Sequence, residues 1–382
     1  MIKLAFVATG YIVDYDGVSV FIENLLKNFL KEKDVQDKKI YIDIYTNQTA
    51  QELLKKRVDT QKTDNINFIT IKSGRFVKFL DLQLHLLRKK YDHIFMPTPM
   101  PVFFTRGKVT KVVLDLTIKQ TPEFFSKAFH LYIDFLIWYM KKFDYAIGYI
   151  SKQTKDDLEK FYSITDKNKK LLFFENGVPF KVQSYNRPTD EEVEKKFSSS
   201  TLEFVAVGRI NRSKGFDRIL DFLDQLDIYL EDEKRLKKTV LNIVGKQTDE
   251  TQELFKQKSY KNIDLIFHGY VDDKKLNNLY KNSHYCIFLS RNEGYGLPLI
   301  EALWFKTVVI ISDLPVFSEI IGEDYPKFSD KTGYKDAIVE FVKKSYFDKS
   351  YQKELYTIIE DRVKKAKKAY TNASKTLLEL IK

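Results

Sequence analysis

The chain has 382 residues and a formal net charge of +11, and 43% of its residues are hydrophobic. That length allows two domains with full cores, and the single cysteine, Cys286, excludes an intrachain disulfide and a metal site built on cysteines. No apolar run approaches the ~20 residues that cross a bilayer, and the run at residues 1–7 is too short for a signal peptide. We expect a cytoplasmic protein whose contact with a membrane, if it has one, is at the surface.

The excess of positive charge lies mainly in residues 1–180. A basic half suggests a polyanionic partner, and three classes fit: an anionic membrane surface, a phosphate-bearing lipid or a nucleic acid. A lysine-rich composition without such a partner explains the same excess. Charge alone therefore leaves the partner open.

The first half alternates between apolar strands and helical patterns. Residues 2–7 are a short apolar run, which is followed by a glycine loop and a helical pattern over residues 19–31. This order opens a doubly wound α/β fold, although no Gly-x-Gly-x-x-Gly fingerprint is present. Further strands are predicted at 40–45, 67–71, 93–96, 111–116, 144–151 and 171–174, and further helices at 76–91, at 124–142 and from 151.

Two of these helices are unusual in composition. The helix over residues 76–91 has an apolar side and basic ends, and the helix over residues 124–142 is strongly aromatic. Core packing explains both patterns, and so does a position on anionic lipid. His130 stands alone on the second helix, and we expect it to be structural rather than a catalytic base.

The second half restarts the alternation after residues 181–200, which are polar and are predicted to be a linker. The loop after its first strand contains Arg209 and Lys214. An arginine binds phosphate oxygens bidentately and a lysine supplies a mobile charge, whereas the alternative is two ordinary surface cations. The predicted strands are 204–207, 240–244, 265–267, 285–290 and 308–312, and the predicted helices include 216–229, 273–280 and 350–382.

The most informative stretch is residues 290–303, which directly follow an apolar strand. Gly294 and Gly296 allow a tight turn with uncovered amides, and a proline follows where a helix would begin. Amides in such a turn, ahead of a helix N-terminus, form an anion site. Glu293 and Glu301 flank it, and carboxylates suit the hydroxyls of a sugar and a ribose better than they suit phosphate.

The string Glu-Gly-Tyr-Gly-Leu-Pro-Leu-Ile-Glu-Ala-Leu over residues 293–303 resembles the Glu-x7-Glu motif of retaining glycosyltransferases of the GT-B fold, family 4 (glycosyl transferases group 1). Residues 208–215 match the family's Gly-Arg-x4-Lys-Gly pattern, and the resemblance spans essentially the whole chain. It implies two doubly wound Rossmann-like domains facing a cleft. The implied parts are an acceptor-side domain (1–180), a linker (181–200), a nucleotide-sugar domain (201–365) and a last helix crossing back to the first domain (366–382).

The resemblance also implies the reaction, which is transfer of a sugar from a nucleotide diphosphate donor with retention of anomeric configuration. Glu293 would hold the sugar hydroxyls, and Arg209 and Lys214 would stabilise the departing diphosphate. The other implied donor-binding residues are Glu301 at the ribose, the turn of Gly294, Tyr295, Gly296 and Leu297, and Gly17, Asp115, Gly269 and Tyr270.

One departure from the family pattern lies beside Asp115. The family usually reads His-Asp-Leu here, but this chain has Leu114 at the histidine position. That histidine commonly lies near the donor sugar, so its loss leaves the donor's identity open. Asp115 itself has an alternative role as the cap of the following turn.

No metal or cofactor is expected, because cations already face the phosphates and the string Asp14-Tyr15-Asp16 lies in an opening loop. The expected partners are the nucleotide-sugar donor and a cell-envelope, lipid-linked or other glycan acceptor, without nucleic acid. An anionic membrane at the inner face of the cell membrane is a further candidate. Two alternatives remain, namely another GT-B enzyme (a phosphorylase or an epimerase) and a non-catalytic subunit that binds nucleotide sugar.

Overall fold

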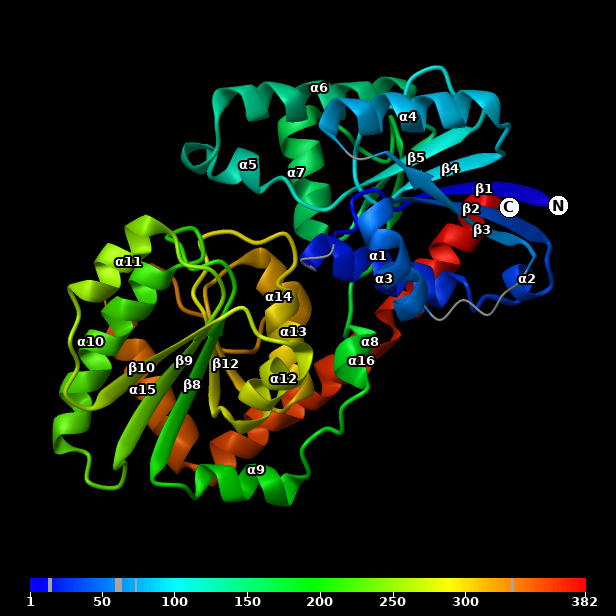
Figure 1. Ribbon diagram of the computed structural model, residues 1–382. Helices are drawn as coiled ribbons and strands as arrows, with labels where there is room; N and C mark the ends of the chain where they lie inside the picture. Colours follow the sequence, from blue (N-terminus) through cyan, green and yellow to red (C-terminus); the bar gives the residue numbers. More distant parts are fainter. Residues whose placement is uncertain (13–15, 59–63, 73, 331–332) are drawn as a thin grey trace. The chain divides into compact units, whose positions relative to one another are not determined.

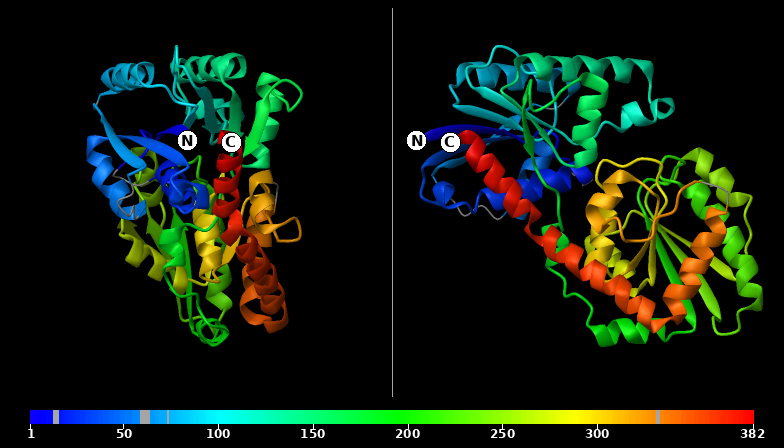
Figure 2. Two further views of the ribbon diagram at one scale, coloured as in Figure 1. Left: turned by 90° about the vertical axis from the view of Figure 1, so that its right-hand side faces the viewer. Right: turned by 180° about the vertical axis from the view of Figure 1, so that it is seen from behind.

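The computed structural model describes residues 1–12, 16–58, 64–72, 74–330 and 333–382. The chain forms two compact units. Unit 1 combines Met1–Gly177 with Lys368–Lys382, and unit 2 is Val178–Lys367. Within each unit, helices cover both faces of a parallel sheet (Figures 1 and 2). The predicted class, two doubly wound α/β domains, is confirmed.

Unit 1 is built on a seven-stranded sheet of order β3-β2-β1-β4-β5-β6-β7, in which all neighbours are parallel. Its strands are β1 (Ile2–Val7), β2 (Ile40–Asn47), β3 (Ile66–Ile71), β4 (His93–Met96), β5 (Lys108–Val113), β6 (Ala146–Tyr149) and β7 (Lys170–Phe173). Its helices are α1 (Gly17–Phe29), α2 (Lys33–Gln36), α3 (Gln48–Val58), α4 (Arg75–Arg88), α5 (Thr117–Gln120), the 3-10 turn η1 (Pro122–Phe124), α6 (Lys127–Phe143) and α7 (Lys152–Tyr162).

Local signals in the sequence set the ends of several of these elements. The strand predicted over residues 2–7 is β1, and Leu4 to Val7 are buried because both faces of a parallel sheet are covered. Ser151 caps α7 by accepting from the amide of Thr154 at 3.1 Å. The strand predicted over residues 111–116 begins and ends three residues earlier, because residues 114–116 leave the sheet and lead into α5.

Unit 2 is built on a five-stranded sheet of order β10-β9-β8-β11-β12, also parallel throughout. Its strands are β8 (Thr201–Val207), β9 (Lys238–Val244), β10 (Ile263–Gly269), β11 (Tyr285–Phe288) and β12 (Val308–Ile311). Its helices are α8 (Phe180–Gln183), α9 (Asp190–Phe197), α10 (Phe216–Asp232), α11 (Asp249–Lys256), α12 (Asp273–Asn282), α13 (Leu297–Trp304), α14 (Pro315–Ile321), α15 (Tyr334–Phe347) and the larger part of α16 (Lys349–Ile381).

Residues 181–200, predicted to be a linker, belong instead to unit 2 and contain α9. Thr189 starts α9 with a capping box, in which Thr189 and Glu192 bond each other's backbone amides. Val193 and Phe197 are buried in the unit 2 core, and the Phe197 ring lies 5.0 Å from that of His284. Helix α9 is polar except for these two buried side chains, so its composition resembles that of a linker. The linker prediction was wrong for this reason.

The last helix, α16, is shared between the units, because its residues 368–382 cluster with unit 1. There the Ser374 hydroxyl donates to Glu32 at 2.5 Å, and Lys382 forms an ion pair with Asp34. Among the helices of the described residues, none is long and apolar enough to cross a bilayer.

Candidate functional site

Three loops at the carboxyl edge of the unit 2 sheet lie in close contact. The Gly245 amide, after β9, donates to the Gly269 carbonyl at 2.9 Å, and the Gly208 amide donates to the Val244 carbonyl at 3.0 Å. Gly245 has φ +136°, and a Cβ there would lie 1.8 Å from the Gly208 carbonyl oxygen. Glycine is therefore required where the loops after β8 and β9 meet. Tyr270 follows Gly269 and is exposed.

The loop after β8 also meets the loop after β11. Gly215, the N-cap of α10, has φ +71°, and a Cβ there would lie 1.8 Å from the Leu289 carbonyl oxygen. The Arg291 amide donates to the Ser213 carbonyl at 2.9 Å, and Asn211 accepts from the Lys214 amide at 2.9 Å. The two segments that resemble the family are thus held against each other by backbone contacts.

Lys214 and Glu293 meet across this junction. The Lys214 Nζ lies 2.7 Å from the Glu293 Oε1, which also accepts from the Ser290 hydroxyl at 2.8 Å. Glu293 is only 8% exposed, whereas Lys214 remains half-buried. Lys214 is therefore the more accessible member of a pair of opposite charges at the mouth of the turn.

The turn after Glu293 has the geometry expected of an anion site. Gly296 has φ +100°, and its Cβ would lie 2.9 Å from the Phe317 ring, so only glycine fits. The helix α13 begins at Leu297 with a proline in its first turn. Among the described residues, the backbone N–H groups of Gly294, Gly296 and Leu297 have no hydrogen-bond acceptor. Tyr295 packs against the unit 2 core.

Glu301 lies one turn into α13 and is buried with two partners. The Tyr280 hydroxyl donates to its Oε2 at 3.2 Å, and the Lys181 Nζ lies 3.4 Å from its Oε1. Burial disfavours the charged form of Lys181, but the carboxylates of Glu301 and Asp273 outweigh it and raise the Lys181 pKa. Lys181 is missing from the sequence-based site, since it lies 120 residues before Glu301 in a segment interpreted as a linker.

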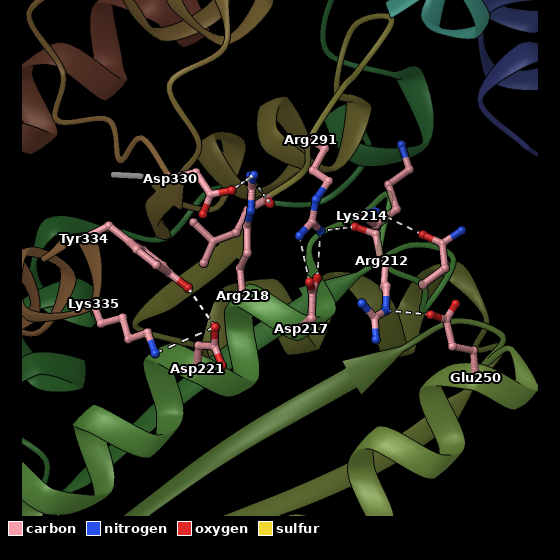
Figure 3. Close-up of polar contacts among 12 residues, drawn as sticks. Arg212, Lys214, Asp217, Arg218, Asp221, Glu250, Arg291, Asp330, Tyr334 and Lys335 are labelled. Carbon is pink, nitrogen blue, oxygen red and sulfur yellow. Dashed lines mark hydrogen bonds and ion pairs between the residues drawn. The ribbon is translucent and has the colours of Figure 1, made fainter. Parts of the chain in front are cut away.

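Three arginines around these loops pair with acidic side chains (Figure 3). Arg291 binds both carboxylate oxygens of Asp217 at 2.7 Å, and Arg212 lies 2.5 Å from Glu250. Arg218, on α10, contacts Asp330. Burial favours the neutral form of Asp217, but Arg291 outweighs that effect and lowers its pKa.

Arg209 differs from these cations. It is exposed, and among the described residues it has no acidic partner. Of the cations in this loop, Lys214 pairs with Glu293 and Arg212 pairs with Glu250, so Arg209 alone lacks an acidic partner within the described ranges. The structure places Arg209, Lys214, Glu293, Glu301 and the turn of residues 294–297 on one unit.

The remaining predicted residues, Gly17 and Asp115, lie in unit 1. Gly17 is the first residue of α1, whose cap, Asp16, accepts from the Ser19 amide at 2.9 Å. Asp115 accepts from the amide and the hydroxyl of Thr117, so it has the capping contacts of its alternative role. The Leu114 carbonyl accepts from the Thr154 hydroxyl at 3.3 Å.

The described part of the chain contains no group of three or more His, Cys, Asp or Glu side chains arranged to hold a metal ion. Asp14 and Tyr15 of the Asp-x-Asp string lie outside the described residues. Asp16, the third member of that string, is engaged in capping α1.

Comparison with known proteins identifies the family of the second half of the chain. Residues 188–375, which contain the junction between the loops after β8 and β11, match the family model described as Glycosyl transferases group 1. This part of the chain belongs to the family. Unit 2 of this group 1 glycosyltransferase thus carries the family's domain, with Arg209, Lys214, Glu293 and Glu301 at the carboxyl edge of its sheet.

Two curated relatives of this group 1 glycosyltransferase are mannosyltransferases by name. The serotype-specific mannosyltransferase WbdA of Escherichia coli is 34% identical over 151 residues, which are 39% of this chain and 18% of WbdA. The O-antigen chain mannosyltransferase RfbU of Salmonella typhimurium is 37% identical over 70 residues, which are 18% of this chain and 20% of RfbU. The matched stretches thus span a fifth or less of these relatives.

Among solved structures, HepE of Anabaena in complex with UDP and glucose superimposes with a TM-score of 0.68. The match covers 100% of this chain and 99% of HepE at 13% identity. At that identity the likeness shows the fold alone, and the fold is GT-B.

Proposed function

We propose that this glycosyltransferase transfers a sugar, with retention of anomeric configuration, from a nucleoside diphosphate donor to a glycan or lipid-linked acceptor of the cell envelope. The observation that carries the proposal is the pair of Lys214 and Glu293 at the mouth of a turn with free amides. A cation, free amides and a carboxylate are the groups that a diphosphate and a sugar hydroxyl require at adjacent positions.

The charged and uncharged parts of the donor bind different groups of the protein. Its diphosphate binds Arg209, Lys214 and the amides of residues 294–297, which stabilise the charge that develops as the phosphate departs. Its sugar hydroxyls donate to Glu293, and its ribose contacts Glu301. When the donor binds, Lys214 leaves Glu293 and binds phosphate. Glu293 is then free to accept from the sugar hydroxyls. Gly269 and Tyr270, at the end of β10, complete the part of the donor site that lies on unit 2.

Such a site needs no metal ion, because two cations and a helix N-terminus already face the diphosphate. Transfer is therefore expected to continue in the presence of EDTA. The relatives named as mannosyltransferases and the neighbour that binds UDP and glucose support mannose and glucose as the first sugars to test. We place the reaction in the cytoplasm, at the inner face of the membrane, where lipid-linked acceptors are built.

The experiment incubates the full chain with nucleoside diphosphate mannose or glucose, a membrane extract as acceptor source, and EDTA. The wild type should release the nucleoside diphosphate and form a product whose anomeric configuration, read by NMR, equals that of the donor. Glu293→Ala should lose transfer by a factor of at least ~100, whereas Arg212→Ala, at a structural ion pair of the same loop, should retain it. Undiminished turnover by Glu293→Ala would refute the assignment, and an inverted product would refute retention.

A further inference from the structure

Unit 1 exposes large apolar side chains along two helices and the loop between β4 and β5. We call this surface the α4–α6 face. Its apolar members are Val77, Leu80, Leu84 and Leu87 of α4, Phe104 of the loop, and Leu131, Tyr132, Phe135, Trp138 and Phe143 of α6. Figures 1 and 2 show α4 and α6 on the same face of the unit 1 sheet. A patch of this kind marks an interaction surface in a folded protein.

The exposed residues of α4 form a stripe that the core does not use. Val77, Leu80, Leu84 and Leu87 follow helical spacing and lie on one side of α4. The opposite side supplies the buried Leu82 and Leu86 to the core. The helix is therefore apolar on both sides, which packing against the sheet does not explain.

Helix α6 repeats this arrangement with aromatic residues. Leu131 is 71% exposed and Trp138 is 50% exposed, with Phe135 between them on the same side of the helix. Ile137 and Met140, on the other side, are buried in a core cluster of unit 1. The rings of Phe135 and Trp138 lie 6.0 Å apart, so the outward residues form a continuous aromatic surface.

Phe104 follows Phe103, a residue that contacts both helices. Its neighbour Phe103 contacts Phe79 of α4 at 5.9 Å and Tyr139 of α6 at 5.1 Å between ring centroids. Gln83 of α4 accepts from the Phe103 amide at 2.6 Å, which fixes the loop. Phe104 then adopts φ +54°, a conformation that bulky residues rarely take, and its side chain is 86% exposed. The strained backbone of Phe104 thus holds an aromatic ring in the solvent. This arrangement indicates that the ring contacts something outside the chain.

The exposed charges without an opposite partner on or beside the α4–α6 face are mostly cationic. The acid of α4, Asp81, accepts from the Lys72 amide at 2.9 Å, and the acid of α6, Asp134, pairs with Lys119. Glu123, in η1, is an exposed acid at the margin. Among the described residues, five exposed cations on or beside the face have no acidic partner: Arg88, Lys90, Arg106, Lys127 and Lys142.

We infer that the α4–α6 face docks on the surface of a lipid bilayer that contains anionic lipid. Apolar and aromatic side chains between unpaired cations are the composition of a helix lying in the headgroup region, where rings enter the interface and cations reach the lipid phosphates. Lys142 illustrates the arrangement, since its Nζ lies 5.5 Å from the Trp138 ring and 5.6 Å from the Phe143 ring. The inference stands apart from sugar transfer, because binding is measured without a donor.

The test sediments the full chain with vesicles of phosphatidylcholine alone or mixed with phosphatidylglycerol, at low and high salt. The wild type should bind the anionic vesicles and dissociate as salt rises. Phe104→Asn should weaken binding at least about fivefold while leaving the melting temperature unchanged or raised, because asparagine tolerates the left-handed conformation. The double variant Leu131→Ser, Trp138→Ser should weaken it further.

Two controls make the result decisive. Ile228→Ser removes an apolar side chain that is 63% exposed on α10 of unit 2, and it should bind vesicles like the wild type. Arg106→Gln should weaken binding about fivefold, as expected for one cation at an anionic surface. Wild-type protein that ignores anionic vesicles, or variants of the face that bind undiminished, would overturn the proposal. So would a lipid-free dimer that Phe104→Asn dissociates, because the face would then join two copies.

Discussion

Lys214 and Glu293 form an ion pair across two loops, with Nζ 2.7 Å from Oε1 and the carboxylate buried. The pair joins residues 79 positions apart in the chain. Each side chain therefore holds the other in position. In the proposed site, Lys214 would bind the donor phosphate and Glu293 the donor sugar. In the proposed donor complex, phosphate and Glu293 would compete for the same ammonium group.

This competition predicts opposite effects of Glu293→Gln on two measurements. Binding of UDP or GDP, which lack the sugar, should tighten by about fivefold, because a negative charge beside the diphosphate has been removed. Transfer should nevertheless fall by a factor of ~100 or more, because the sugar hydroxyls lose a charged acceptor and one of its two oxygens is replaced by an NH2 donor. Calorimetry measures the first effect and product release the second. Weaker nucleotide binding by this variant would show that Glu293 does not compete for Lys214.

Arg209→Ala should lower kcat/KM for the donor by about 100-fold without changing the free energy of unfolding. The reason is that Arg209 is exposed and has no acidic partner in the described part of the chain, so its removal breaks no internal contact, while a diphosphate loses a bidentate ligand. Arg212→Ala is the matched control, because it removes a cation of the same loop that pairs with Glu250. Equal activities of the two variants would count against a role for Arg209.

Lys181→Met should destabilise unit 2 by about 3 kcal/mol, because it leaves the buried Glu301 carboxylate without its cation. The double variant Lys181→Met, Glu301→Gln should recover most of that stability, since no unpaired charge remains. The KM for the donor should stay raised in the double variant if Glu301 also binds the ribose. Chemical unfolding and initial rates separate these two contributions.

Gly215→Ala should destabilise the fold by roughly 3 kcal/mol or more, because the new methyl group would lie 1.8 Å from the Leu289 carbonyl oxygen. Gly333→Ala is the control. Gly333 also has a positive φ, +86°, but a Cβ there meets nothing within 4 Å, so the cost should be only about 1 kcal/mol. The difference between the two variants measures the close approach of the loops after β8 and β11.

His284 should make the folded protein less stable as the pH falls below 6.5. Burial, followed by the nearby Lys196, lowers the His284 pKa from 6.5 to about 3. Its Nδ1 accepts from the Glu203 amide at 3.0 Å, which requires the neutral ring. Between these pH values the unfolded chain binds a proton that the folded chain does not, so stability declines by up to about 1.4 kcal/mol per pH unit. Urea unfolding at pH 7 and pH 5 should show a smaller decline for His284→Asn.

The sequence predicted the elements that rest on local signals. The apolar run of β1 was placed at its observed ends, and the Ser151 cap marked the start of α7. The glycines and the proline of residues 294–298 predicted the turn and the start of α13, because these residues have backbone preferences that do not depend on distant contacts. The predicted strand at residues 111–116 was displaced, since Leu114 and Leu116 are apolar enough to extend a strand that in fact ends at Val113.

By itself, then, the sequence determined the α/β class, the family and the residues that line the candidate anion site, because each depends on composition or on a contiguous motif. Only the tertiary structure decided which charges meet. The pairing of Lys181 with Glu301, the placement of α9 in the unit 2 core and the exposure of Phe104 all depend on contacts between distant parts of the chain. An amphipathic or polar pattern indicates whether a side chain prefers an apolar or a polar environment. Which residue or solvent provides that environment depends on the folded chain.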